Sequence, residues 1–453
     1  MRNIWKDKVF LSTMITLAIP ITLQNFITSS LNLVDNLMIG KLGETPIAAV
    51  GLANQFFYIF LLCIAGVNAG ANVFMAQYWG KKDIENIKKM LGIVLSVGFA
   101  ATIVFGIAGI CFPTQIMGLF SKDAEVISQG ATYMRIVSVS AIFINITQGF
   151  STALRSTEQP KLPMFGSLIG VAINAFLNWI FIFGNLGAPA MGVAGAAIAT
   201  TIARVIEMVF IVSMVYVRRN LVSTKIKQMF SYTREDVARY FSVSTSAILN
   251  ELVWSFGLMA FSMAYALIGT NAVATMQIAT TLNNMFLVIC IGLAVSASIM
   301  IGNKIGSDEE EVARDYANKI GILAPLCGFI LGIIIWITAP FITSLFDVQP
   351  ETAIATTNVL RIMAVVSALR FFNVVMIIGV YRGGGDTLYT TILQSCTVWV
   401  FAVPLAFICA AVFKLSVEQV FLAVCAEEVV KIFFVLQRLK SGKWIRNVIK
   451  QTA

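Results

Sequence analysis

Histidine is absent from this sequence of 453 residues, and charged residues make up only 12% of it. Without histidine the chain lacks the commonest metal ligand and the commonest general base, so any proton handling must rest on carboxylates. No GxxxxGKS or GxxxxGKT phosphate-binding loop occurs, which excludes ATP as the direct energy source. The seven cysteines form no CxxC pair and no pair of catalytic acids is evident, so the sequence predicts neither an enzyme nor a bound cofactor.

Hydrophobic residues, by contrast, make up 58% of the chain. A water-soluble globule of this length needs more polar surface than the remaining residues supply, so the chain must be solvated by lipid. Backbone groups in lipid find no water to bond, which restricts spanning segments to helices or closed barrels. Long continuous apolar runs favour helices, and the predicted fold is therefore an all-α membrane protein.

The apolar runs predict twelve transmembrane helices. The first run has no small-residue cleavage site before it ends at Ile39, so we expect it to remain as a span. The predicted spans are 11–39, 47–76, 90–112, 131–153, 163–183, 191–216, 240–265, 272–302, 317–340, 355–380, 388–411 and 417–437.

The positions of Lys and Arg indicate how these spans are oriented. With the N-terminus in the cytoplasm, 24 of them fall in segments predicted to lie inside, whereas the outside loops contain only Lys41, Lys122 and Lys414. Cytoplasmic loops are enriched in Lys and Arg, so we expect a multi-pass protein of the plasma (inner) membrane with both termini cytoplasmic. The net charge of +9 is a topology signal and does not indicate a nucleic-acid partner.

The two halves of the chain repeat at a constant offset. The segment FLLCIAGVNAGANVFMAQYWGKKDIENI, which begins at Phe60, aligns with FLVICIGLAVSASIMIGNKIGSDEEEVA, which begins at Phe286. The identical positions include Gly80 and Gly306. Six spans per half bring the second half into the membrane from the same side, which predicts a parallel repeat about an axis along the membrane normal.

This repeat predicts two pseudo-symmetric six-helix lobes. The N-lobe comprises residues 1–216, a cytoplasmic linker loop comprises residues 217–239, and the C-lobe comprises residues 240–453. A substrate is then expected between the lobes.

The first span and its exit, AIPITLQNFITSSLNLVDNLMIGKLGETPIAAVGLANQ, contain a proline, an N-L-x-D element, a G-x-L-G turn and an A-A-V-G start to the second span. In these features the chain resembles the multidrug and toxic compound extrusion (MATE) family. GAAIAT in span six and the related segments ALRSTEQPKLPM and VYRGGGDTLYT are similar to the family as well. A major-facilitator protein would carry a GxxxDRxGRR-like loop after span two, where this chain has QYWGKKDIENIKK.

The resemblance implies a secondary active multidrug exporter. Such a protein antiports Na⁺ or H⁺ against small organic, mainly cationic or hydrophobic compounds by alternating access, and it needs no cofactor besides the coupling ion. We expect small-molecule substrates and membrane lipids as partners, and a monomer. The alternative is a related flippase of lipid-linked precursors. Its anionic cargo should require several basic residues in the cavity, and only Arg370 and Arg204 lie away from helix ends.

Asp35 is the first candidate for a functional residue. It lies in the outer half of span one with no charged residue within several positions. An ionised carboxylate at membrane depth is expensive unless it faces a partner, water or an ion. The resemblance places Asp35 at the family's essential acidic position, so we predict that it couples the cation to transport. The alternative is that it only bonds neighbouring backbone near the helix end.

Three further polar residues are the predicted neighbours of Asp35. Asn174 and Asn178 are one turn apart on a single face of span five, and Thr200 lies in the GAAIAT segment. Amide and hydroxyl oxygens beside a carboxylate suit a hard cation such as Na⁺, and equally a network around a protonated Asp35. Ordinary interhelical hydrogen bonding is the alternative. Some family members carry an aspartate where Asn178 stands, so its absence argues against a two-acid proton mechanism.

Glu251, in span seven, is the second acidic candidate. By the repeat offset it corresponds to Asn25, so the two lobes differ chemically. Sodium-coupled family members carry a glutamate in this helix, but it aligns nearer to Trp254. The role of Glu251 therefore stays open between binding cationic substrate in the cavity and coupling.

Pro20 removes a backbone hydrogen bond from span one, about four turns before Asp35, so this helix is able to bend. Two further pairs, Arg204 with Glu207 and Glu427 with Lys431, have the spacing of helical ion pairs. We interpret these pairs as neutralising contacts.

Overall fold

The computed structural model describes residues 6–344, 346 and 349–450, and of residues 32 and 33 it describes the backbone alone. The described residues form helices and connecting turns, with no strand among them. The helices are α1 (Lys8–Gly40), α2 (Glu44–Gly80), α3 (Ile84–Cys111), α4 (Pro113–Phe120), α5 (Ala124–Ser138), α6 (Ala141–Ser156), α7 (Lys161–Phe183), α8 (Gly192–Val217), α9 (Ile226–Met229), α10 (Arg234–Ala266), α11 (Thr270–Gly306), α12 (Glu310–Thr343), α13 (Pro350–Val374), α14 (Thr387–Ser395), α15 (Val403–Phe407) and α16 (Val417–Ser441). A short 3₁₀ turn (Asn185–Gly187) and three π-helical segments (Val375–Tyr381, Cys396–Ala402 and Ile408–Val412) complete the described elements.

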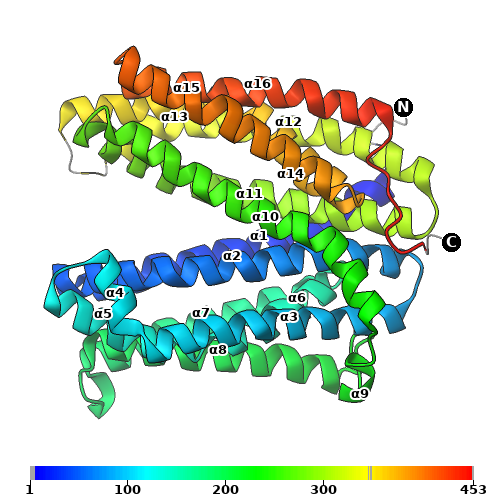
Figure 1. Cartoon of the computed structure of the whole chain (residues 1–453), viewed down its shortest axis with the longest axis horizontal. Coiled ribbons are helices and arrows are strands. Elements are labelled where there is room, and N and C mark those ends of the chain that lie inside the picture. Colours follow the sequence, from blue (N-terminus) through cyan, green and yellow to red (C-terminus); the bar gives the residue numbers. More distant parts are fainter. Residues whose placement is uncertain (1–5, 345, 347–348, 451–453) are drawn as a thin grey trace. The chain divides into compact units, whose positions relative to one another are not determined.

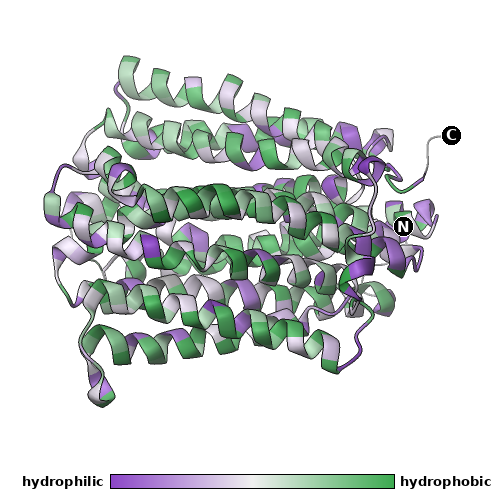
Figure 2. Ribbon diagram, turned by 60° about the horizontal axis from the view of Figure 1, so that its bottom comes forward, coloured by the Kyte–Doolittle hydropathy of each residue, from purple (hydrophilic) through white to green (hydrophobic). Residues whose placement is uncertain are grey.

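Within the described ranges, ten helices are long and apolar enough to cross a membrane, and the bent pair α5 and α6 raises the number to eleven. Apolar residues dominate the middle of the helices, whereas hydrophilic residues gather toward their ends and in the loops (Figure 2). The predicted all-helical, multi-pass membrane protein is thereby confirmed. The predicted twelfth span forms as α16, but Glu427, Glu428 and Lys431 interrupt its apolar run, so it is not among the eleven.

The predicted fourth span, residues 131–153, is two helices rather than one. α5 and α6 meet at an angle of 46° around residues 139 and 140. At this break both the backbone N–H and the hydroxyl of Ser140 donate to the carbonyl of Val137, at 2.8 and 2.6 Å. A serine that bonds nearby backbone competes with the regular helical ladder, which explains a bend without proline.

The chain folds into two compact units. Unit 1 comprises Met1–Thr22, Ala76–Lys81 and Thr245–Ala453, and unit 2 comprises Leu23–Met75 and Lys82–Ser244. Three helices, α1, α2 and α10, therefore contribute to both units (Figure 1). α1 passes from unit 1 to unit 2 after Thr22. This point is two residues after Pro20, which has no backbone N–H and so removes one hydrogen bond from the helix.

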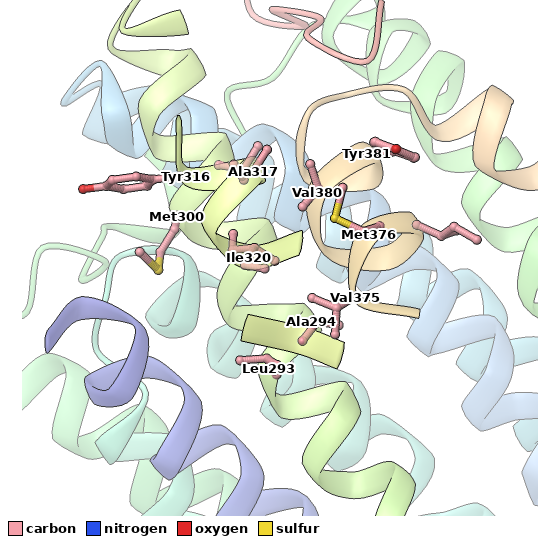
Figure 3. Close-up of a cluster of buried hydrophobic side chains, with 14 of the residues drawn as sticks. Leu293, Ala294, Met300, Tyr316, Ala317, Ile320, Val375, Met376, Val380 and Tyr381 are labelled. Atoms are coloured by element: carbon pink, nitrogen blue, oxygen red, sulfur yellow. The ribbon is translucent and has the colours of Figure 1, made fainter. Parts of the chain in front are cut away.

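The core of unit 1 is built on α11, α12 and the π-helical segment Val375–Tyr381. Leu293 and Ala294 face Val375 and Met376, while Ala317 and Ile320 of α12 close the cluster (Figure 3). The first half of α1 joins this core through four buried residues spaced three or four apart, on one helical face. These are Phe10, Met14, Leu17 and Ile21.

The two repeat-related glycines of the sequence make reciprocal contacts in unit 1. A Cβ atom added to Gly80 would lie 1.9 Å from the carbonyl oxygen of Asn303, and one added to Gly306 would lie 1.9 Å from that of Gln77. Gln77 and Asn303 are themselves related by the repeat offset. The backbones of α2 and α11 are therefore in direct contact where the ends of the two helices cross. Only glycine, which has no side chain, permits so close an approach.

The C-terminal segment after α16 packs back on unit 1. Trp444 is fully buried, and the side chain of Gln77 both donates to the carbonyl of Arg446 (3.0 Å) and accepts from the N–H of Val448 (2.9 Å). The buried carboxylate of Asp386 receives a hydrogen bond of 2.7 Å from Arg438 at the end of α16. These contacts hold the C-terminal segment after α16 in place.

In unit 2, α7 packs along α8, and α5 and α6 pack against α8 (Figure 1). Gly166 and Gly195 allow the close approach of α7 and α8, because added Cβ atoms would lie 2.6 Å from the side chain of Ile211 and 2.4 Å from the carbonyl oxygen of Phe181. The second half of α1 completes this unit beside α7.

Candidate functional site

A continuous chain of hydrogen bonds joins α1, α7 and α8 inside unit 2. The amide nitrogen of Asn178 donates to Oδ1 of Asp35 (2.5 Å) and to Oδ1 of Asn174 (3.0 Å). Asn174 in turn donates to the hydroxyl of Thr200 (3.1 Å). Both asparagines are fully buried, whereas Asp35 keeps partial exposure. The structure therefore brings together the four residues that the sequence groups around Asp35.

A second polar layer lies further along the same helices, eleven residues away on α1 and seven residues away on α8. Gln24 on α1 donates to the hydroxyl of Ser167 on α7 (3.2 Å), and Ser167 donates to Oε1 of Glu207 on α8 (2.9 Å). The pairs Gln24/Ser167 and Asp35/Asn178 both differ by 143 residues, so α1 and α7 run parallel and in register over three turns. At 1.5 Å per residue, Gln24 and Asp35 are about 16 Å apart along α1.

The side-chain amide of Asn178 uses only part of its hydrogen-bonding capacity within the described residues. Its nitrogen makes two hydrogen bonds, while its buried Oδ1 has no partner among the described residues. A buried acceptor without a partner is costly, so it marks a place where a group is missing. Amide nitrogen and oxygen exchange places when the side-chain amide turns over, and the oxygen would then face the oxygens of Asp35 and Asn174. Three oxygens that converge in this way fit a hard cation.

A basic residue lies next to this cluster on α8. Arg204 is one helical turn from Thr200, on the same face of the helix. Arg204 donates to Oε2 of Glu207 at 2.8 Å, which forms the ion pair expected from the i, i+3 spacing. Among the described residues, Asp35 has no ion-pair partner, whereas the guanidinium of Arg204 is paired with Glu207.

Glu251 lies in unit 1, and it has a basic partner. Arg382 donates to Oε1 of Glu251 (3.0 Å) and to Oδ1 of Asn250 (3.2 Å). The arginine is buried, and the glutamate is partly exposed. The charge of Glu251 is therefore largely balanced inside unit 1.

Other polar residues of unit 1 form a network on α13 and α16. Arg370 donates to Asn283 at 3.2 Å and lines a small pocket with Phe286, Leu287 and Met363. Glu427 forms the expected ion pair with Lys431 and accepts a hydrogen bond from Thr397. These contacts satisfy the charges of Glu427 and Lys431 within the unit.

Comparison with known proteins decides the family. The MatE family model matches residues 20–180 and, a second time, residues 246–408. This chain belongs to the MATE family. The starts of the two matches, at residues 20 and 246, are related by the same offset as Phe60 and Phe286 in the two halves of the sequence. MATE proteins are transporters, so the chain is a transporter and not an enzyme.

Several curated MATE proteins are similar to the chain over most of its length. Probable multidrug resistance protein YoeA of Bacillus subtilis is 26% identical over 88% of this chain and 87% of its own length. Probable multidrug resistance protein NorM of Thermotoga maritima is 22% identical over 96% and 93%. Multidrug resistance protein NorM of Vibrio vulnificus (strain YJ016) is 26% identical over 70% and 69%.

Solved MATE structures share the fold. A mutant of the Vibrio cholerae MATE transporter VcmN superposes with a TM-score of 0.88 at 18% identity, over 97% of this chain and 98% of that one. A structure described as MATE in the bent conformation gives 0.87 at 21% identity, over 96% of each chain. One described as MATE in the straight conformation gives 0.86 at 22% identity, over 95% and 96%.

The sequence analysis of this MATE protein identified the acidic residues of the site but missed some of the residues that hydrogen-bond to them. Gln24 and Ser167, which hold Glu207, were not singled out, although each precedes a predicted site residue by eleven positions on its own helix. That spacing repeats the same helical face and could have indicated them. Arg382 was counted as a loop charge, whereas it is buried against Glu251.

Proposed function

We propose that this MATE protein is a secondary active multidrug exporter that antiports Na⁺ or H⁺ against small organic, mainly cationic or hydrophobic compounds. Family membership and the names of the curated multidrug resistance proteins support export. The observation that carries the coupling is the Asp35–Asn178 contact, with the unpartnered Oδ1 of Asn178 beside it. The residues present there fit a small cation.

In the proposed cycle, an external cation neutralises Asp35 with oxygens from Asn174, Asn178 and Thr200. A ligand shifts a conformational equilibrium only through its differential affinity for the two states. A carboxylate in a poorly solvated site provides this difference, because its charge is tolerated far better with the ion than without it. The ion-bound state is proposed to release cargo outside, and loss of the ion to the cytoplasm resets the carrier.

We also propose twelve spans in two six-helix lobes, residues 1–216 and 240–453, joined by a cytoplasmic linker loop of residues 217–239. The distribution of Lys and Arg supports cytoplasmic termini in the inner membrane. α16 then serves as the twelfth span, with Glu427 paired to Lys431 within the helix and hydrogen-bonded by Thr397 of the segment Cys396–Ala402. We propose that the transporter acts as a monomer surrounded by lipid.

Pro20 is proposed as the point at which α1 bends during transport. The residues up to Thr22 pack with unit 1, whereas those from Leu23 on pack with unit 2. A helix that serves two packing units and lacks a backbone hydrogen bond next to the change is suited to bend there.

Glu251 is proposed to act in the C-lobe, either on cationic substrate or in coupling. Its partial exposure leaves one side of the carboxylate accessible, while Arg382 holds the other. A flippase for anionic lipid-linked precursors is less well supported, since both Arg370 and Arg204 already have acceptor partners.

The experiment that tests this function measures export in proteoliposomes. Purified protein is reconstituted, and uptake of a fluorescent organic cation into the lumen is followed under an imposed Na⁺ gradient and then under an imposed H⁺ gradient, without ATP. We expect at least one gradient to drive accumulation. Transport that is indifferent to both gradients would overturn the antiporter proposal.

A further inference from the structure

Three ionisable side chains of unit 2 are connected through the two polar layers: Asp35, Arg204 and Glu207. Arg204 and Glu207 pair at 2.8 Å, so their charges cancel. The charge of the set is then zero only when Asp35 is neutralised by a bound cation. Pairing of Arg204 with Asp35 in place of Glu207 would leave Glu207 as the unpaired carboxylate, so only an added cation brings the charge of the set to zero.

Glu207 is held firmly in its present position. It is 3% exposed, and Ser167 donates to Oε1 while Arg204 donates to Oε2. Gly170 of α7 leaves room for the carboxylate, because an added Cβ atom would lie 3.4 Å from Oε2. The serine is in turn bound by Gln24. Glu207 is therefore the fixed member of the ion pair.

Arg204 is the less restrained member. Its side chain is 25% exposed, and among the described residues its guanidinium makes one hydrogen bond, to Glu207. It lies on the same face of α8 as Thr200, one turn away, and Thr200 is part of the Asp35 cluster. Arg204 is therefore a long, flexible side chain that lies next to the polar cluster containing Asp35.

We propose that Arg204 is an internal counter-charge that competes with the coupling cation for Asp35, and that Glu207 holds Arg204 away so that the site accepts the cation. This inference rests on the proposed function and assigns positioning roles to two residues outside the ion-binding set. When the cation leaves, Arg204 turns toward Asp35 and stabilises the empty carboxylate. When a cation arrives, Arg204 returns to Glu207.

The test measures Na⁺ affinity of purified protein in detergent, by isothermal titration calorimetry and by Na⁺-dependent thermal stabilisation. Glu207→Gln releases Arg204 toward Asp35 and should weaken Na⁺ binding by about tenfold or more, since opposite charges several ångströms apart interact this strongly near a protein interior. Arg204→Gln should tighten Na⁺ binding. The double variant should return to within about threefold of the parent.

Two further variants separate this role from a structural one. Ser167→Ala removes only the hydroxyl that holds Glu207, and it should weaken Na⁺ binding in the same direction by less. Glu427→Gln is the matched control, because Glu427 has the same kind of partners, a cation one turn away and a hydroxyl, in unit 1. It should leave Na⁺ affinity unchanged.

Opposite shifts for Glu207→Gln and Arg204→Gln support the inference, whereas shifts in the same direction, or none in correctly folded protein, overturn it. A parent protein that does not bind Na⁺ overturns it as well. Proton-driven export in proteoliposomes would in that case leave the proposed function standing. Conversely, opposite affinity shifts without export under either gradient would refute the function alone.

Discussion

Replacing Asp35 with asparagine removes one charge and almost nothing else. The amide oxygen that replaces Oδ1 can still accept the 2.5 Å hydrogen bond from Asn178, so the contact between α1 and α7 persists. We therefore expect the variant to insert, fold and bind cargo as the parent does. Only the attraction between the site and its cation is lost.

The size of that loss follows from the geometry. Two unit charges about 4 Å apart attract by about 4 kcal/mol at the effective dielectric constant of a protein site, and each 1.4 kcal/mol changes affinity about tenfold. A cation that took its place among the oxygens of Asp35, Asn174 and Asn178 would lie within that distance. Asp35→Asn should consequently weaken cation binding by about a thousandfold.

The assay compares cargo binding with cargo accumulation. Fluorescence titration of the purified variant should give the parent's cargo affinity, while proteoliposomes should fail to concentrate cargo under a gradient that drives the parent. Asp123→Asn serves as the control, since this exposed acid caps α5 and asparagine caps equally well. If Asp35→Asn protein concentrates cargo as the parent does, Asp35 is structural and the proposed coupling site is wrong.

Three other changes have defined outcomes. Glu251→Gln should weaken binding of cationic cargo more than that of neutral cargo in the same titration, and equal weakening would favour a structural or coupling role. Gly80→Ala should destabilise the protein by about 1–3 kcal/mol, because its Cβ atom would lie 1.9 Å from a backbone carbonyl, whereas Gly106→Ala, with open space around it, should leave the melting temperature nearly unchanged. Arg438→Leu should destabilise by about 1–3 kcal/mol, since the fully buried Asp386 then keeps Arg446 as its basic partner; a melting temperature equal to that of the parent would contradict this account.

The sequence predicted the helices and the residues that share a helical face. It predicted the contacts between helices less well. The spacing of Asn174 and Asn178 was enough to place both on one face, because helical periodicity is local. The hydrogen bonds to Asp35 depend on the register between α1 and α7, which no local pattern specifies. The bend at Ser140 was missed for a similar reason, since serine in a helix does not always compete for the backbone.

The burial of Arg382 could not be predicted from the sequence. Arg382 follows a long apolar run beside three glycines, which is typical of a loop, and it counted toward the predicted topology. In the structure these glycines allow the chain to turn closely under the C-terminal segment: a Cβ atom on Gly384 would lie 2.6 Å from the carbonyl oxygen of Trp444. Arg382 is thereby enclosed and pairs with Glu251.

The most direct test of antiport reverses the flow. Proteoliposomes with equal ion concentrations on both sides receive an imposed gradient of an organic cation, and ion movement is followed with radioactive Na⁺ and with a pH-sensitive dye. The account predicts that cargo moving down its gradient drives one of these ions in the opposite direction, and that Asp35→Asn abolishes this movement. Cargo flux without ion countermovement, or equal countermovement in the variant, would contradict the account.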